Sequence, residues 1–118
     1  MTKSIPKPGW DKKVGDSYIG KYILIGITYI DHKGNEKQKQ QLHGVITSAD
    51  KKEGIKISLK GVYDGQSWTM PPDQRSISIA KPGTYTLKMS DEKIKNPDLL
   101  STWIINEPDP EKAIHKAP

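Results

Sequence analysis

Three short segments alternate apolar and polar residues, and this period of two constrains the fold more than any other feature of the chain. The segments are residues 55–60, 76–79 and 84–89. Successive side chains of a β-strand point to opposite faces, so such a segment buries one face and leaves the other in water. In the first segment, Ile55, Ile57 and Leu59 are predicted to face a core, while Lys56 and Lys60 face solvent. The pattern predicts an all-β protein.

Other segments extend this prediction. Residues 18–30 are mostly apolar and predict a central strand, which Gly20 and Gly26 bend. Residues 31–36 are rich in turn formers, so residues 37–49 are predicted to run back antiparallel. The first half of this predicted strand, residues 37–41, is polar on both faces and indicates a solvated arm or edge. Residues 102–105 predict the last strand.

Five or six short strands joined by hairpin turns leave exposed edges unless the sheet curls around on itself. The sequence therefore predicts a small, antiparallel, strongly bent sheet that forms a barrel of five to six strands. A two-layer sandwich is the main alternative architecture.

Residues 42–50 followed by 55–59 resemble the first motif of Sm-like proteins. In that motif a strand with a glycine at its middle, here Gly44, leads through an aspartate turn, here Asp50, into an alternating strand. The family's RNA-contacting asparagine would follow the aspartate, but Lys51 stands there, and no Arg-Gly pair of the second motif occurs downstream. The resemblance spans residues 42–59, which are 18 of the 118 residues. It implies a bent-strand barrel of the Sm-like or SH3-like type, without RNA binding or ring assembly.

A chain of 118 residues is the usual size of one domain. We predict a flexible basic N-terminal arm at 1–13, one β-barrel domain at 14–106 and a flexible C-terminal tail at 107–118. Cysteine is absent, which excludes disulfides, thiolate zinc sites and a cysteine nucleophile. The longest apolar run, residues 23–30, is too short to span a bilayer as a helix, and no signal segment is visible. These features predict a soluble, cytoplasmic protein.

The chain has a formal net charge of +5, and its excess of positive charge lies in the N-terminal half. Lys37 and Lys39 are predicted to share one strand face, and Lys56 and Lys60 another. Lysines in such rows bind phosphates without sequence preference. The chain has a single arginine, Arg75, so it lacks the guanidinium groups that read base sequence. Any nucleic-acid binding is therefore predicted to be weak and sequence-independent.

Two aromatic residues, Tyr63 and Trp68, flank a turn at residues 64–65 and are predicted to approach each other across it. They supply either core packing, in a chain that has no phenylalanine, or a platform for a ligand. The histidines His32, His43 and His115 have no metal-ligand spacing, and no serine has the surroundings of a nucleophile. The sequence predicts no catalytic residue, no metal and no cofactor.

These observations favour a non-enzymatic module that binds an unknown protein or peptide. The predicted contact surfaces are an exposed sheet edge at residues 37–41, which also permits self-association, and the Tyr63 and Trp68 surface. The first alternative is a weak nucleic-acid or anionic-surface binder, and the second is a small-ligand-binding barrel. The candidate binding residues are Lys37, Lys39, Lys56, Lys60, Tyr63 and Trp68.

Overall fold

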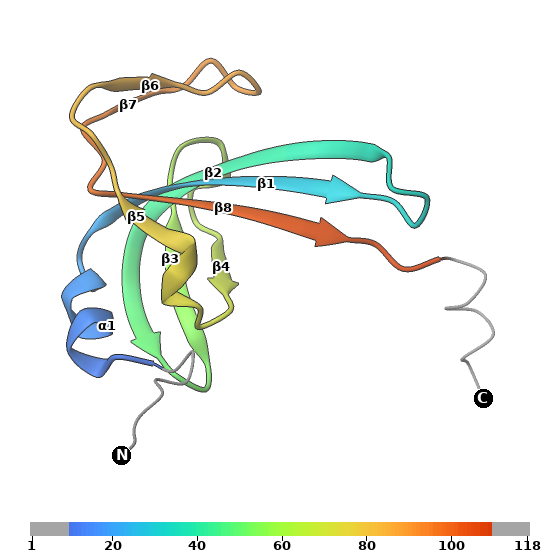
Figure 1. Ribbon diagram of the computed structural model, residues 1–118. Coiled ribbons are helices and arrows are strands. Elements are labelled where there is room, and N and C mark those ends of the chain that lie inside the picture. Colours follow the sequence, from blue (N-terminus) through green and yellow to red (C-terminus); the bar gives the residue numbers. More distant parts are fainter. Residues whose placement is uncertain (1–9, 110–118) are drawn as a thin grey trace.

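Residues 10–109 are described in a computed structural model, and strands dominate them (Figure 1), which confirms the predicted all-β class. The strands are β1 Tyr22–Ile30, β2 Glu36–Asp50, β3 Gly54–Leu59, β4 Ser67–Met70, β5 Ile77–Ile79, β6 Thr84–Thr86, β7 Lys93–Lys95 and β8 Leu99–Asn106. The helices are α1 Lys12–Tyr18 and two 3-10 turns, η1 Gly61–Tyr63 and η2 Gln74–Ser76. Most of the predicted arm and tail, residues 1–9 and 110–118, lies outside the described residues.

Six strands form one sheet in the order β4-β3-β2-β1-β8-β5, and β6 pairs with β7 in a separate ribbon. The predicted antiparallel sheet is wrong at one pair, because β1 and β8 run parallel. A parallel pair needs a long crossover connection, and here strands β2 to β7 lie between its two members in the chain. The order ends at β4 and β5, which do not pair, so the sheet is open rather than a closed barrel.

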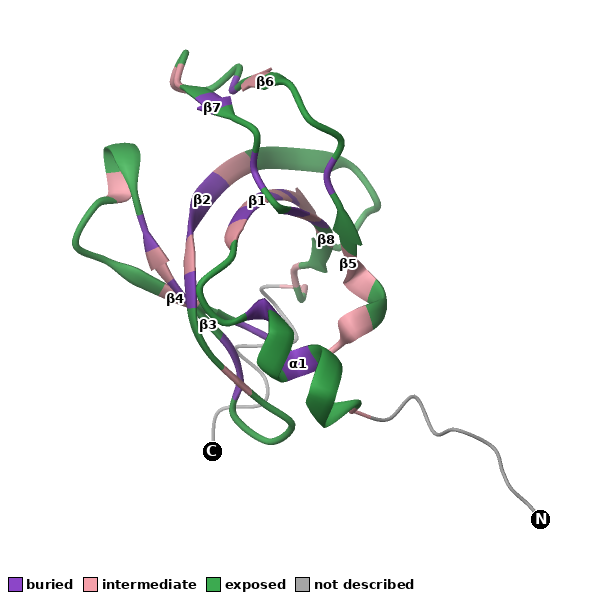
Figure 2. Cartoon of the chain, turned by 90° about the vertical axis from the view of Figure 1, so that its left-hand side faces the viewer, coloured by how far each residue is buried: buried purple, intermediate pink, exposed green. Residues whose placement is uncertain are grey.

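The open sheet nevertheless curls strongly around its own core, as Figure 2 shows in the sweep of β2. Alternate residues of the three central strands fill the concave side. Among the most buried of these core side chains are Ile23, Ile25, Ile46, Ile55 and Ile57. Across the curl, the Ser101 hydroxyl on β8 lies 4.0 Å from the Met70 sulfur on β4. The interior is thus occupied by packed side chains.

Helix α1 closes one side of this core and was not predicted from the sequence. Its N-cap is Asp11, whose carboxylate accepts a hydrogen bond from the Val14 amide at 3.1 Å. The Gln74 side chain bonds both the amide and the carbonyl of Asp11, each at 2.8 Å. Trp10 and Tyr18 pack against the core cluster. The helix begins at Lys12, inside the range predicted as an arm.

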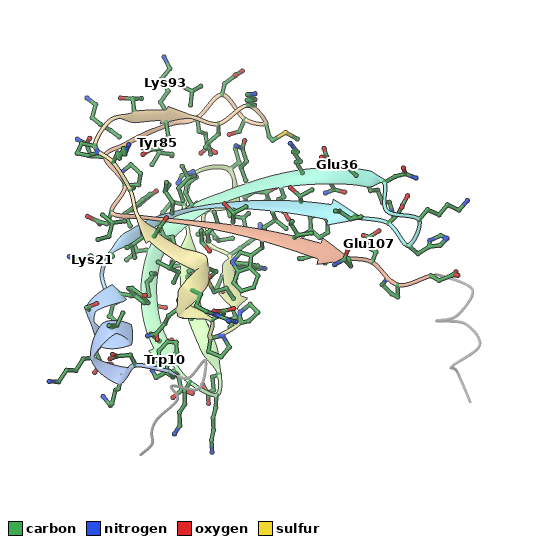
Figure 3. All side chains as sticks on the ribbon, viewed as in Figure 1. Trp10, Lys21, Glu36, Tyr85, Lys93 and Glu107 are labelled. Atoms are coloured by element: carbon green, nitrogen blue, oxygen red, sulfur yellow. The ribbon has the colours of Figure 1, made fainter. Side chains whose placement is uncertain are left out.

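Three strands extend beyond the body of the sheet as an arm, visible at the right of Figure 1. We define the arm as residues 27–30, 36–42 and 102–106. Strand β3 pairs with β2 only from Gly44 onward, and β5 pairs with β8 only as far as Ser101. The arm therefore has one free edge on β2 and another on β8. Figure 3 places Glu36 and Glu107 toward its outer end.

The β6-β7 ribbon, residues 84–95, lies apart from the sheet at the top of Figure 1. Its loop, residues 87–92, returns to β2 through two contacts. The Met89 amide donates to the Gln41 side chain at 3.2 Å, and Glu92 binds His43. Leu87 and Ile94 are buried, whereas Lys93 extends into solvent (Figure 3). Within residues 10–109, no helix has the length and apolar character needed to cross a membrane.

Candidate peptide-binding groove beside strand β2

The free edge of β2 presents unpaired backbone groups at defined residues. The Lys60 amide donates to the His43 carbonyl at 2.9 Å, so the peptide groups of His43 point away from β1. The Ile46 amide donates to the Lys21 carbonyl at 3.0 Å and points the opposite way. Backbone direction alternates along a strand, and the β1-β2 register is regular here. The backbone groups of Lys39 and Gln41 therefore face the free edge.

A groove of about 510 Å³ runs beside this edge. It is lined by Gln38, Lys39, Gln40, Gln41, Val62, Tyr63, Met89 and Ser90. One wall is η1, which leaves the sheet directly after β3, and the other is the loop of the β6-β7 ribbon. The groove thus occupies the place that a continued β3 would fill beside β2.

Side chains of β2 attach both walls. Gln40 lies on the concave face, where its amide nitrogen donates to the Tyr63 hydroxyl at 3.4 Å and its oxygen accepts from Tyr29 at 2.9 Å. Gln41 lies on the convex face and accepts from the Met89 amide. Met89 remains 64% exposed, and Val62 remains 63% exposed. The groove therefore offers apolar surface beside unpaired backbone groups.

A buried histidine cluster holds the ribbon against η1 and β2. The Tyr22 hydroxyl lies 2.6 Å from His43 Nδ1, and His43 Nε2 lies 3.1 Å from Glu92 Oε2. The same Glu92 oxygen accepts from the Val62 amide at 3.2 Å, while its second oxygen accepts from Ser90 at 2.8 Å. His43 is only 5% exposed. Strand β2, η1 and the ribbon meet at these few atoms.

The charge state of the cluster follows from its contacts. Burial alone would raise the pKa of Glu92, but hydrogen bonds from Ser90 and His43, the charge of His43 and the Val62 amide lower that pKa overall. Burial, followed by the nearby Glu92 charge, raises the pKa of Tyr22. At neutral pH the ionised Glu92 carboxylate can only accept, so His43 Nε2 donates to it, while the protonated Tyr22 phenol shares a hydrogen bond with His43 Nδ1. The three groups follow one another in the order hydroxyl, histidine, carboxylate, as in a catalytic triad. Both ring nitrogens of His43, however, already bond to side chains of the fold itself.

Gly61 allows the backbone at the start of η1 to lie close to His43 and Glu92. Its φ is +69°, a conformation that side-chain-bearing residues rarely adopt. A Cβ atom at this position would collide with the Glu92 carboxylate and the His43 ring. The glycine at the start of η1 is therefore required both for the turn and for the cluster.

The four predicted lysines share the convex face of the sheet, because the β2-β3 register sets Lys37 and Lys39 on the same side as Lys56 and Lys60. The two predicted strand faces therefore lie side by side on one face of the sheet. Lys37 pairs with Glu107 at 3.1 Å and Lys39 with Glu36 at 3.9 Å. Only Lys39 lines the groove, with Lys60 just before η1, while Lys56 lies farther along β3.

The two predicted aromatic residues have separate environments. Tyr63 lines the groove, whereas Trp68 lies opposite Ile57 on β4, and both pack in part against the core. The one close pair of aromatic rings within residues 10–109 joins Tyr22 and His43, with centroids 5.8 Å apart. The predicted approach of Tyr63 to Trp68 is not observed, so these two rings form no common platform.

Sequence reasoning missed several residues of the groove and cluster. The polar character of residues 37–41 did indicate an edge, and it included Gln40 and Gln41. Met89 and Glu92 bond to β2 from 48 and 49 positions away, and Val62 lines the groove beside it, but no local pattern marked these residues. Gly61 was the available signal, since an isolated glycine after a strand often marks a close backbone approach.

Comparisons with protein-family models, with curated proteins and with solved structures found no match. Across the described residues, no group of three or more histidine, aspartate or glutamate side chains is arranged to hold a metal ion.

Proposed function

We propose that this chain is a non-enzymatic interaction module that binds an extended segment of a partner protein as an additional strand along β2. The observation that carries the proposal is the unpaired edge at Lys39 and Gln41, which opens into a groove with walls on both sides. Strand addition to such an edge is a general mode of peptide recognition, in which backbone hydrogen bonds supply much of the affinity. A lone edge without walls would offer no side-chain pockets for specificity.

The length of the edge sets the size of the ligand. Strand β2 lacks a partner on this side over residues 36–42, which corresponds to about 23 Å at 3.3 Å per residue. A segment of about seven residues fits this length. In this proposal the curled sheet is a half-open barrel of the SH3-like or Sm-like kind, in which the unclosed arm provides the binding edge.

A proline substitution tests the proposal because it removes one edge donor. A randomised heptapeptide display library is panned against the full chain, and the selected peptides are titrated against Lys39→Pro. We expect binding to weaken about tenfold, which corresponds to the loss of one hydrogen bond worth roughly 1.4 kcal/mol. Lys39→Gln controls for the lost charge and retains the N–H group. Peptides that bind wild type and Lys39→Pro equally would contradict strand addition at this edge.

Gln40→Pro provides a matched structural control. The Gln40 peptide groups face β1, so this proline removes a bond of the β1-β2 ladder and is expected to lower the stability of the fold. The Lys39 N–H faces the groove, so Lys39→Pro leaves the ladder intact. Thermal unfolding of both variants establishes which one still presents a folded edge.

A second candidate function is supported by the shared face of the four lysines. Lys37, Lys39, Lys56 and Lys60 give the convex face a positive character that suits sequence-independent contact with nucleic-acid phosphates. Fluorescence anisotropy with labelled single-stranded RNA and DNA across a salt series tests this function. Binding should weaken steeply as salt rises, and absence of binding at low salt would contradict it.

A further inference from the structure

We infer that the partner segment alternates acidic and apolar residues, with its acidic side chains on the convex face of the sheet. This inference rests on the proposed strand addition and names the chemistry of the ligand. It follows from which side chains of β2, η1 and the ribbon lie on each face of the added strand.

The convex side of the groove selects charge. An added strand would place every second side chain beside Lys39 and Gln41, whose side chains both lie on that face. Lys39 is the one charged residue that lines the groove, and Lys37 follows on the same face toward the tip. Acidic side chains on the ligand complement these cations, whereas basic ones oppose them.

Existing ion pairs of the two lysines are weak competitors for a ligand. The Lys37 side chain is 61% exposed in its contact with Glu107, and Lys39 is 59% exposed in its 3.9 Å contact with Glu36. Exposed pairs of this kind contribute little to stability. A ligand carboxylate can therefore replace Glu36 as the partner of Lys39 with little loss of folding stability.

The concave side of the groove selects apolar side chains. Positions between the acidic residues would point toward Gln40 and Tyr63, next to the end of the core cluster at Leu42. The Tyr63 hydroxyl already accepts from Gln40, and the Gln40 oxygen already accepts from Tyr29. An apolar side chain therefore covers the ring without leaving these polar groups unpaired.

Three synthetic heptapeptides test the inference with the full chain. Each alternates valine with a second residue, which is glutamate, glutamine or lysine, so that backbone length and strand propensity are matched. Isothermal titration is expected to show binding of the glutamate peptide about fivefold tighter than the glutamine peptide, from two weak charge pairs. The lysine peptide should bind weakest, and the differences should shrink as salt rises.

A charge reversal separates the inference from the proposed function. In Lys39→Glu the affinity for the glutamate peptide is expected to fall to that of the lysine peptide or below it. Lys56 lies on the same face but outside the groove, so Lys56→Glu should leave the order of the two affinities unchanged. Equal binding of all three peptides that is lost in Lys39→Pro would overturn the acidic preference and leave strand addition in place. Absence of binding by all three would overturn both. Glutamate-peptide binding that persists in Lys39→Pro and is displaced by RNA would favour the anionic-surface function instead.

Discussion

The two halves of strand β2 belong to one continuous element but meet different surroundings. From Leu42 to Ile46 the strand is mostly buried, and from Gly44 onward it has β1 on one side and β3 on the other. From Glu36 to Lys39 it is exposed and has β1 alone. The difference shows how a small β protein can present an exposed docking edge without losing its strand register. The buried half of β2 fixes the register of β2 with its neighbours, and the exposed half of the same strand keeps that register.

The two edges of the arm differ in a similar way. The β8 edge beyond Ser101 is uncharged, with Ile104 60% exposed and Ile105 37% exposed. The β2 edge carries Lys37 and Lys39, which oppose indiscriminate pairing. Only the β2 edge lies in a groove with walls from η1 and the ribbon. The contrast favours the β2 edge as the selective one.

The largest expected effect on stability distinguishes a buried position in the body of the sheet from an exposed position in the groove wall. Ile57 is completely buried between neighbouring strands, and Ile57→Ala is expected to lower the free energy of unfolding by about 2 to 5 kcal/mol. Val62 is 63% exposed, so Val62→Ala should change the free energy of unfolding by less than about 0.5 kcal/mol. Urea unfolding measures both. Similar losses for the two variants would show that the groove wall is part of the core.

A second prediction concerns the glycine that joins the body to the groove. Gly61→Ala and Gly65→Ala both place a side chain at a positive φ, which costs about 1 to 2 kcal/mol in each case. Only at Gly61 does the new Cβ collide with Glu92 and His43, while Gly65 has open space around it. We expect Gly61→Ala to be less stable than Gly65→Ala by roughly a further 1 to 3 kcal/mol. Equal losses in thermal unfolding would mean that the cluster does not require close contact at Gly61.

Much of the body could be predicted from the sequence because its strands bury one face. Ile55, Ile57 and Leu59 are buried as the alternation predicted. The same pattern fails at Ile79, which is 85% exposed because β5 has only three residues at the edge of the sheet. Periodicity reports which face of a strand is apolar, but it does not report whether another element covers that face.

The groove was only partly predictable for a different physical reason. The polar segment at residues 37–41 indicated the edge, because a strand that is polar on both faces cannot lie inside a core. The walls depend on tertiary contacts, such as the one from Glu92 to His43, between residues 49 positions apart. The parallel pairing of β8 with β1 is also a long-range choice, and the local turn signals pointed to antiparallel neighbours throughout.

The smallest expected effect tests whether the body and the groove are linked through Glu92. The pKa of Glu92 in the folded chain lies below its ordinary value of 4.5, so the unfolded chain binds a proton at higher pH than the folded chain does. The stability that the carboxylate contributes is therefore present above pH 4.5 and is lost as the pH falls through the folded pKa. Glu92→Gln removes this titration, and it is expected to cost about 1 to 2 kcal/mol at pH 7 because a neutral amide replaces a charged acceptor.

Urea unfolding at a series of pH values from 7 to 3 measures that difference between Glu92→Gln and wild type. We expect the gap to narrow as the pH falls from 4.5 through the lowered pKa of folded Glu92, because the wild-type carboxylate then takes up its proton and no longer accepts hydrogen bonds as an anion. Lys39→Gln, whose exposed side chain lines the groove without contacting the cluster, should follow the wild-type profile. A gap that stays constant from pH 7 to 3 would show that the charge of Glu92 contributes nothing to the attachment of the ribbon to β2.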